Sequence, residues 1–496
     1  MVAEPPVLDR ALLRLASVVV LGTIMSILDT TIVNVAIETL GRDLNSSLSS
    51  IQWVATGYLL ALSTVIPLTG WAMERFGGKR MWMISVTLFM VGSTLCGLAW
   101  STPSLIVFRV LQGFGGGMIL PIGQAILAQA AGPQRMGRVM SVIGVPTLLG
   151  PVLGPVIGGV IVDHFSWRWI FFVNLPVGLV ALVLAARILP AADAYRSRPR
   201  LDLRGLLLLS PGLAALIYGL SEFGIEGGFG SAKVLVGVVA GVVLLAAFGL
   251  HAVRAGSGAL LDLRLFRDRA FAAASGTTFI FGVSLFGAMF VLPLYYQVAR
   301  GQSALDAGLL LAPQGLGAAT AMPIAGRLTD RRGAGRIVPY GVLVAVLGTG
   351  VYTQLSADTS YLLLAVSLYV RGAGLGMTMM PSMAAAYQTL SRAAVPRATT
   401  SINIIRTVGG SLGTAILSVV LERQIVAELG GSPGTVGALR STGSAAARAA
   451  EPLAHAFGDT FWWAVGLTAL ALIPAMFLPR EPAASRRAPV AEPEAA

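Results

Sequence analysis

Residues 70–80 read GWAMERFGGKR, and the same pattern returns in the second half of the chain as GRLTDRRGAGR at residues 326–336. In both copies a glycine, an acid, an arginine, a second glycine and a final arginine have the same spacing. A weaker echo relates GGGMILP at 115–121 to GLGMTMMP at 374–381. The repeats predict two related halves that run in the same direction through one framework.

The composition indicates whether these two halves lie in water or in lipid. Apolar residues make up 55% of the chain and charged residues 12%, and the mean hydropathy is +0.78. Ordinary soluble domains are about half apolar and a quarter charged. A soluble core could not bury this much apolar surface, so the chain is expected to lie in a lipid bilayer. The single cysteine, Cys96, excludes an internal disulfide.

Apolar stretches of membrane-spanning length divide the chain. About fourteen stretches are long enough to cross a bilayer as helices. They fall near residues 15–37, 51–73, 81–100, 104–130, 137–162, 168–189, 205–222, 231–252, 271–297, 303–326, 337–355, 360–388, 396–421 and 460–478. The expected fold is all-α and integral to the membrane, with two six-helix bundles and two inserted helices.

The predicted domains follow from these spans. Residues 1–189 form an N-terminal six-helix bundle, and residues 190–270 form a linker with two inserted transmembrane helices. Residues 271–496 form a C-terminal six-helix bundle with a long outer loop at 423–459 and a cytoplasmic tail.

The basic residues predict the orientation. Most of the 35 Lys and Arg fall in segments on one side of the predicted spans, which the positive-inside rule places in the cytoplasm. Both termini are therefore expected inside, in a multi-pass protein of the cell membrane. The net charge of +12 serves topology and does not indicate a nucleic-acid partner, since the basic residues share no single face.

The paired loops resemble the signature of the major facilitator superfamily, Gly-x-x-x-Asp-Arg-x-Gly-Arg-Arg. An acid beside arginine in a short loop can close a charge cluster against a neighbouring helix end and hold one conformation. The resemblance implies a conformational latch formed by Glu74, Arg75, Arg80, Asp330, Arg331 and Arg336. The alternative is that the basic residues only fix topology. The first copy departs from the signature at Glu74 and Gly78.

RVLQGFG at residues 109–115 resembles the fourth-helix motif of the same superfamily. An arginine within a span is costly unless it faces a partner or a cavity, so Arg109 is a candidate functional residue. The alternative is a side chain that reaches the nearby membrane surface. Arg371 and Arg406 raise the same question, and their roles stay open.

GPVLGPVIGG at residues 150–159 matches the family's Gly-x-x-x-Gly-Pro-x-x-Gly-Gly motif. Glycines four residues apart allow close helix packing, and prolines bend the helix. Within the superfamily this motif accompanies exporters. The residues that carry the antiporter motif are Gly150, Gly154, Pro155, Gly158 and Gly159.

LDTTIVNVA at residues 28–36 and WRWIFFVNLPVG at 167–178 resemble motifs of drug:proton antiporters with fourteen helices, the EmrB/QacA type. Asp29 is an acid deep within a predicted span, where burial favours its protonated form and a neighbouring Arg109 favours its ionised form. A carboxylate balanced between these influences can take up and release a proton. The alternative is an aspartate permanently paired for structural reasons.

Polar residues on the spans are candidate substrate contacts, because binding pockets combine apolar surface with a few polar groups. The candidates are Asn34, Gln52, Tyr58, Gln124, Tyr295, Tyr296, Gln297, Gln314 and Asn403. The alternative is that they form hydrogen bonds between helices. Glu222 is a possible second proton site near a helix end.

The sequence therefore predicts a proton-coupled antiporter that exports small amphipathic organic compounds by alternating access. A dedicated exporter of one metabolite, siderophore or lipid and a non-transporting membrane sensor remain alternatives. No ATP-binding motif, cofactor or metal site is expected, and the three histidines form no catalytic constellation. The expected partners are substrate, protons and lipid; a monomer is expected, and an accessory export partner stays open.

Overall fold

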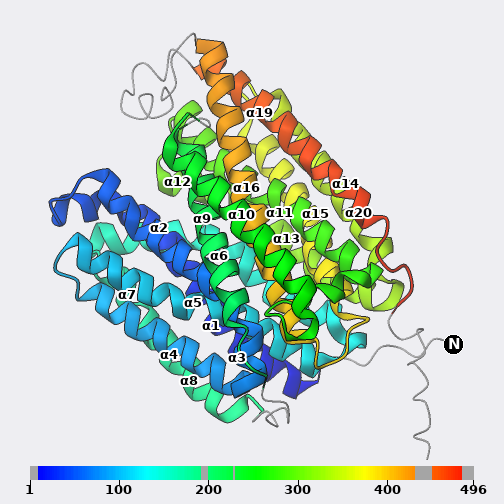
Figure 1. Cartoon of the computed structure of the whole chain (residues 1–496). Helices are drawn as coiled ribbons and strands as arrows, with labels where there is room; N and C mark the ends of the chain where they lie inside the picture. The colour runs from blue at the N-terminus through cyan, green and yellow to red at the C-terminus, as the bar shows by residue number, and fades with distance from the viewer. Residues whose placement is uncertain (1–8, 191–198, 227–229, 430–449, 483–496) are drawn as a thin grey trace, which may run out of the picture.

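The computed structural model describes residues 9–190, 199–226, 230–429 and 450–482, and within these ranges the chain forms helices and no strand (Figure 1). The N-terminal group consists of α1 (Arg10–Asp43), α2 (Leu48–Val65), α3 (Leu68–Phe76), α4 (Gly78–Gly97), α5 (Thr102–Ala131), α6 (Met136–His164), α7 (Trp169–Phe172) and α8 (Asn174–Ile188). Two helices follow, α9 (Leu203–Glu226) and α10 (Ala232–Ala255).

The C-terminal group begins with α11 (Arg269–Leu294), which continues into a π-helical turn at Tyr295–Ala299. It goes on with α12 (Ala304–Leu310), α13 (Ala312–Arg332), α14 (Ala334–Gly350), α15 (Tyr361–Tyr387), α16 (Val395–Leu429), α19 (Ala450–Leu470) and α20 (Leu472–Ala475). Among the described residues, 12 helices are long and apolar enough to cross a membrane, or up to 14 if two bent pairs are each one span. The predicted all-α membrane architecture is confirmed.

The bent pairs correspond to two of the predicted spans. The axis turns by 55° between α2 and α3, where Pro67 cannot donate the backbone hydrogen bond of a continuous helix. Helix α6 bends by 44° within the segment that contains the antiporter motif. Proline and glycine account for such bends physically.

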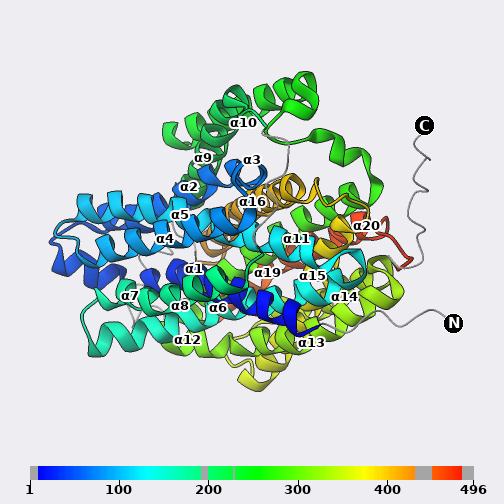
Figure 2. The same cartoon turned by 90° about the horizontal axis from the view of Figure 1, so that it is seen from below.

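Helices α9 and α10 pack against each other and lie on one flank of the other helices (Figure 2). Their backbones approach closely at Gly219 and Gly237, where a side chain on either residue would collide with the opposite helix. The pair is anchored to α2 by the Ser210 hydroxyl, which donates to the Thr64 carbonyl, and by the stacked rings of Trp53 and Tyr218.

Parts of the long outer loop predicted at 423–459 are helical. Helix α16 continues to Leu429 and α19 begins at Ala450, so only residues 430–449 lie outside the described residues. The helices extend because their ends bury apolar side chains in a shared cluster, including Ile425 of α16 and Phe457 of α19. This packing stabilises helix beyond the length that a bilayer requires.

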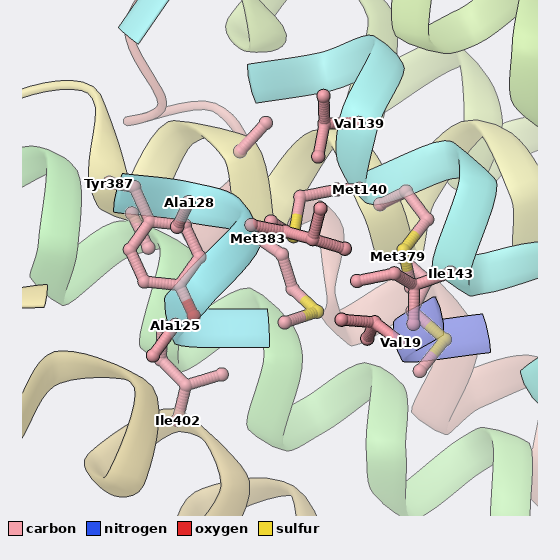
Figure 3. Packing of buried hydrophobic residues seen from close by; sticks show 14 of the residues in the cluster. Val19, Ala125, Ala128, Val139, Met140, Ile143, Met379, Met383, Tyr387 and Ile402 are labelled. Carbon is pink, nitrogen blue, oxygen red and sulfur yellow. The ribbon is translucent and has the colours of Figure 1, made fainter. Parts of the chain in front are cut away.

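The largest apolar cluster joins helices from both groups (Figure 3). Met140 and Ile143 of α6 pack near Met379 and Met383 of α15, and Ala125 of α5 lies near Ile402 of α16. Methionine is flexible and polarisable and therefore fills irregular contacts between surfaces that move. This cluster closes the space between the groups over the part of the helices nearest the repeated loops.

Candidate functional site

A buried ion pair joins the two charged residues predicted to matter most. The Arg109 guanidinium on α5 donates to Asp29 Oδ2 on α1 over 2.6 Å, and the side chains are 1% and 0% exposed. The guanidinium also donates to the Val54 carbonyl and lies 4.0 Å from the centre of the Tyr58 ring. Arg109 therefore points into the helix bundle and does not reach the membrane surface.

Two amides complete the environment of the carboxylate. Gln112 on α5 and Asn174 at the start of α8 both donate to Asp29 Oδ1, over 2.8 and 3.0 Å. Asn174 also donates to the Ser93 hydroxyl, which in turn donates to the Phe171 carbonyl. Sequence reasoning did not assign Asn174 or Gln112 to the site, although both occur within the quoted motifs, and a buried polar residue needs a partner.

Small residues allow these side chains to meet. Gly92 of α4 lies against Gln112, where an added Cβ would be 2.6 Å from the Gln112 Cα. A Cβ at Gly116 of α5 would lie 2.6 Å from the Tyr58 hydroxyl. Any larger residue at either position would force apart the helices that bring together the carboxylate, the guanidinium and the amides.

The arrangement holds Asp29 as a paired carboxylate. Both of its oxygens accept hydrogen bonds from donors that a protonated acid would not need, and Arg109 balances its charge. Separation of the guanidinium from Oδ2 would require α1 to move relative to α5.

The antiporter motif packs α6 directly against the helix that carries Asp29. Added side chains at Gly150 and Gly154 would collide with Ile27 and Thr31 of α1, and the backbone at Gly158 lies close to Ile32. Gly159 differs, because an added Cβ would meet nothing within 4 Å. Pro155 lies on the other side of the contact, facing Gly308 of α12 in the C-terminal group.

The acid of the second repeat contacts the N-terminal group. Asp330 at the end of α13 accepts hydrogen bonds from the backbone N–H groups of Gly137 and Arg138, over 2.8 and 3.3 Å, at the start of α6. The Arg138 guanidinium lies 3.5 Å from the same carboxylate. A carboxylate at a helix N-terminus is favoured by the helix dipole and by the free N–H groups there.

The acid of the first repeat makes the reciprocal contact. Glu74 at the end of α3 forms a two-point ion pair with Arg397 near the start of α16, with N–O distances of 2.8 and 2.9 Å. Gly70 and Gly326, the first residues of the two repeats, lie against α16 and α6 respectively. We call the end of the molecule with these two contacts the latch end.

The basic residues of the repeats lie at the same end of the molecule. Arg75, Arg80, Arg331 and Arg336 are exposed at the latch end, while the arginines that meet the two acids, Arg138 and Arg397, come from the opposite helix groups. The sequence predicted the two acids, Glu74 and Asp330. It did not predict their partners, which lie far away along the chain.

The candidate substrate residues do not form one pocket in this conformation. Tyr58 belongs to the Arg109 site, and Gln124 accepts a 2.8 Å hydrogen bond from Asn403 between the two helix groups. Gln314 accepts from Arg371. The remaining candidates lie apart: Tyr295 and Tyr296 are buried with Tyr352 and Phe457, Gln297 is half-buried beside them, and Asn34 and Gln52 are exposed.

The three residues with open roles differ in their surroundings. Arg371 is 2% exposed and donates to the Gln314 side chain. Arg406 lines a small cavity between α11, α15 and α16. Glu222 is partly exposed near the end of α9.

Comparisons with known sequences identify the protein family of this chain. A sequence profile described as Major Facilitator Superfamily matches residues 19–414. The "Multidrug resistance protein B homolog" of Mycobacterium tuberculosis (strain ATCC 25618 / H37Rv) is 43% identical over 98% of this chain and 93% of its own length. The "Multidrug export protein EmrB" of Haemophilus influenzae is 31% identical over 83% of this chain and 81% of its own.

A solved structure agrees with the fold. The proton:xylose symporter XylE superposes with a TM-score of 0.58 over 93% of this chain and 94% of its own, at 16% identity. The likeness in fold, the profile match over most of the chain and the relative that matches nearly the whole chain agree with one another. The chain belongs to the major facilitator superfamily.

Proposed function

We propose that the protein is a proton-coupled antiporter that exports small amphipathic organic compounds across the cell membrane by alternating access. The buried Asp29 carboxylate carries this proposal, because two helices, α5 and α8, supply it with a cation and two amides inside the bundle, where an ionisable group marks a functional site by default. The names of the two relatives, a multidrug resistance protein homolog and a multidrug export protein, support export.

The proposed cycle uses the ion pair as its coupling element. A proton that reaches Asp29 neutralises the carboxylate and releases Arg109, and this change favours the conformation in which α1 and α5 have separated. One proton moving inward through a 100 mV potential contributes about 2.3 kcal/mol. Substrate and proton then bind in alternation, so export of one accompanies entry of the other.

The proposed topology places the latch end and both termini in the cytoplasm, with residues 1–189 and 271–496 as the two rocking bundles and residues 190–270 as an insertion. In the described conformation the two latches and the Met-rich cluster of Figure 3 close this end. The protein is thus proposed to be in the state that receives protons from outside and has its cytoplasmic entrance shut.

Reconstituted vesicles test the function directly. A panel of fluorescent cations, anions and neutral compounds is offered to proteoliposomes with an imposed pH gradient, and transport of each compound is followed by its fluorescence. At least one compound should move against the proton flow, and an ionophore that collapses the gradient should stop it. Transport that persists without a gradient, or a panel with no transported member, would contradict a proton-coupled exporter.

A further inference from the structure

Arg406 has no role in the cycle just described, yet it lies in the middle of the C-terminal group. Its side chain lines a cavity between α11, α15 and α16, together with the hydroxyls of Thr277, Thr278, Thr378 and Ser382. The side chain is partly exposed, so part of its surface faces open space. An arginine at this depth needs a partner or a water-filled cavity.

Among the described residues, no carboxylate forms an ion pair with Arg406, and no hydrogen bond fixes its guanidinium. The hydroxyls of Thr277 and Thr378 donate to carbonyls of their own helices, at Ala273 and Gly374, each over 2.8 Å, and as neutral groups they do not balance the charge of Arg406. A guanidinium carries five N–H donors and stays charged in proteins. Arg406 lies within electrostatic reach of the neutral Tyr387 side chain, but no carboxylate of the described residues balances its charge, so its N–H donors are available to an acidic ligand.

The charge of the surrounding interior has the same sign. Arg109 is neutralised by Asp29, whereas Arg371 has an uncharged partner, the amide oxygen of Gln314. Among the acids of the C-terminal group that the structure describes, Asp330 is the buried one, and it lies at the end of α13, whereas Asp459 in α19 is exposed. The interior of the C-terminal group thus holds an excess of positive charge, which attracts anions and disfavours cations.

The position of Arg406 fits a substrate contact. It follows Asn403 by three residues on α16, which is a rise of about 4.5 Å. The Asn403 amide closes the space between the helix groups by donating to Gln124. Arg406 thus lies one turn beyond this contact, on the side away from the Glu74–Arg397 latch.

The lining of the cavity indicates which kind of ligand it can receive. Its volume of about 10 Å³ leaves room for about one water molecule, so the cavity has to widen in another conformation of the cycle before a ligand enters it. Apolar side chains, among them Phe281, Phe286 and Met379, line the same cavity. A compact acidic group could meet the guanidinium while an aromatic or aliphatic body lies against these side chains.

We propose that Arg406 binds the acidic group of the exported compound and that the substrates are organic anions, carrying a carboxylate, sulfonate or phenolate on an apolar body. This inference rests on the proposed export function and specifies the charge of the exported compounds. It adds an anion-binding subsite in the C-terminal group to the proton-coupling site in the N-terminal group.

Direct binding tests the charge class without relying on transport. Fluorescein, an anion at pH 7.4, and rhodamine 6G, a cationic ester with the same xanthene ring system, are titrated into the purified full-length protein and followed by fluorescence polarisation. The wild type should bind fluorescein at least 10-fold more tightly than rhodamine 6G. Arg406→Gln should weaken fluorescein binding at least 10-fold and leave rhodamine 6G binding unchanged or stronger.

Two further variants separate charge from folding. Arg406→Lys keeps the cation and should retain fluorescein binding within about 3-fold, since a lysine supplies charge without the planar fork. Arg423→Gln, on the same helix near its far end, should bind like the wild type. All variants should show the same thermal unfolding midpoint within a few degrees, which excludes general damage.

The outcomes distinguish this inference from the proposed function. Absent fluorescein binding, preference for rhodamine 6G, or equal fluorescein affinity in wild type and Arg406→Gln would overturn the anion subsite. Gradient-driven export of rhodamine 6G alone would overturn it while leaving proton-coupled export intact. Fluorescein binding that depends on Arg406, without gradient-driven transport of any compound, would support the subsite and contradict the export function.

Discussion

Asp29 and Arg109 depend on each other because both are fully buried. Removal of one partner from a buried ion pair leaves an uncompensated charge, which typically costs about 3–5 kcal/mol. Gln112 and Asn174 reduce the cost of the intact pair, since they satisfy the second oxygen of the carboxylate. A substitution at Asp29 therefore changes both the chemistry of proton uptake and the stability of the fold, and an experiment has to separate the two effects.

Asp29→Asn should abolish proton-driven export, because the amide cannot titrate. The same change strands the Arg109 charge and should lower the unfolding midpoint. The double variant Asp29→Asn with Arg109→Gln removes both charges and should recover the stability but not the export. Asp29→Glu should keep partial activity, since the titrating group survives on a longer stem. Export is measured in proteoliposomes with a pH gradient; normal pumping by the double variant would move the coupling to another group.

Individual residues of the site also show how much of it the sequence could predict. Asp29 and Arg109 could be identified because a charge deep in an apolar span requires an explanation. Gln112 and Asn174 were not assigned, although they occur in the same motifs, because a neutral amide in a span has many possible hydrogen-bond partners. Their role depends on which side of each helix faces Asp29, and this follows from packing between α4, α5 and α8.

At the scale of elements, the contact between α1 and α6 sets the position of the carboxylate. Added atoms at Gly154 would overlap Thr31, while Gly159 on the same helix has open space beside it. The two glycines therefore provide a matched comparison of one tight position and one loose position in the same motif.

Gly154→Ala should lower the stability by about 1–3 kcal/mol, the usual cost of overpacking, and should reduce export by displacing α1. Gly159→Ala should leave both unchanged within error. Thermal unfolding in detergent and gradient-driven transport measure the two effects. Equal effects of the two substitutions would show that the motif acts through backbone flexibility and not through close packing with α1.

The latches follow from the internal repeat, but their partners do not. Glu74 and Asp330 occupy equivalent positions in the two copies, so the sequence predicted two equivalent acids. Arg397 and Arg138 lie on helices of the opposite groups, and nothing in the local sequence indicates those contacts. A duplicated helical framework explains why the two latches are reciprocal, since each repeat presents the same loop to the corresponding helix of the other half.

Asp330→Asn should slow export several-fold while leaving substrate affinity nearly unchanged, because it weakens one closed state without touching the binding region. Glu74→Gln should have a smaller effect, since its ion pair is partly exposed and thus worth less than the buried contacts of Asp330. Asp358→Asn, at the opposite end of the molecule, is the control. Binding is measured by fluorescence and export in vesicles; a parallel loss of both would show that the latch carboxylate acts on the binding region.

At the scale of the whole molecule, the predicted all-α membrane fold was confirmed, and parts of the connection predicted at 423–459 are helical. Hydropathy locates the spans but cannot show how far a helix continues outside the membrane. Ile425 and Phe457 are buried against each other's helices beyond the predicted span ends, and this contact between distant segments extended both helices. The division into bundles and the orientation in the membrane stay predictions, and orientation can be tested with a single reactive residue.

Cysteine labelling tests the orientation, because the native Cys96 is fully buried and can be replaced by alanine. A cysteine introduced at Ser360, at the end away from the latches, should react with a membrane-impermeant maleimide in intact cells. A cysteine introduced at Arg336, which is exposed at the latch end, should react only after the cells are permeabilised. The reverse pattern would place the latches outside. Since an antiporter that exports must receive its cargo at the cytoplasmic end, the closed latch end would then correspond to the opposite step of the cycle.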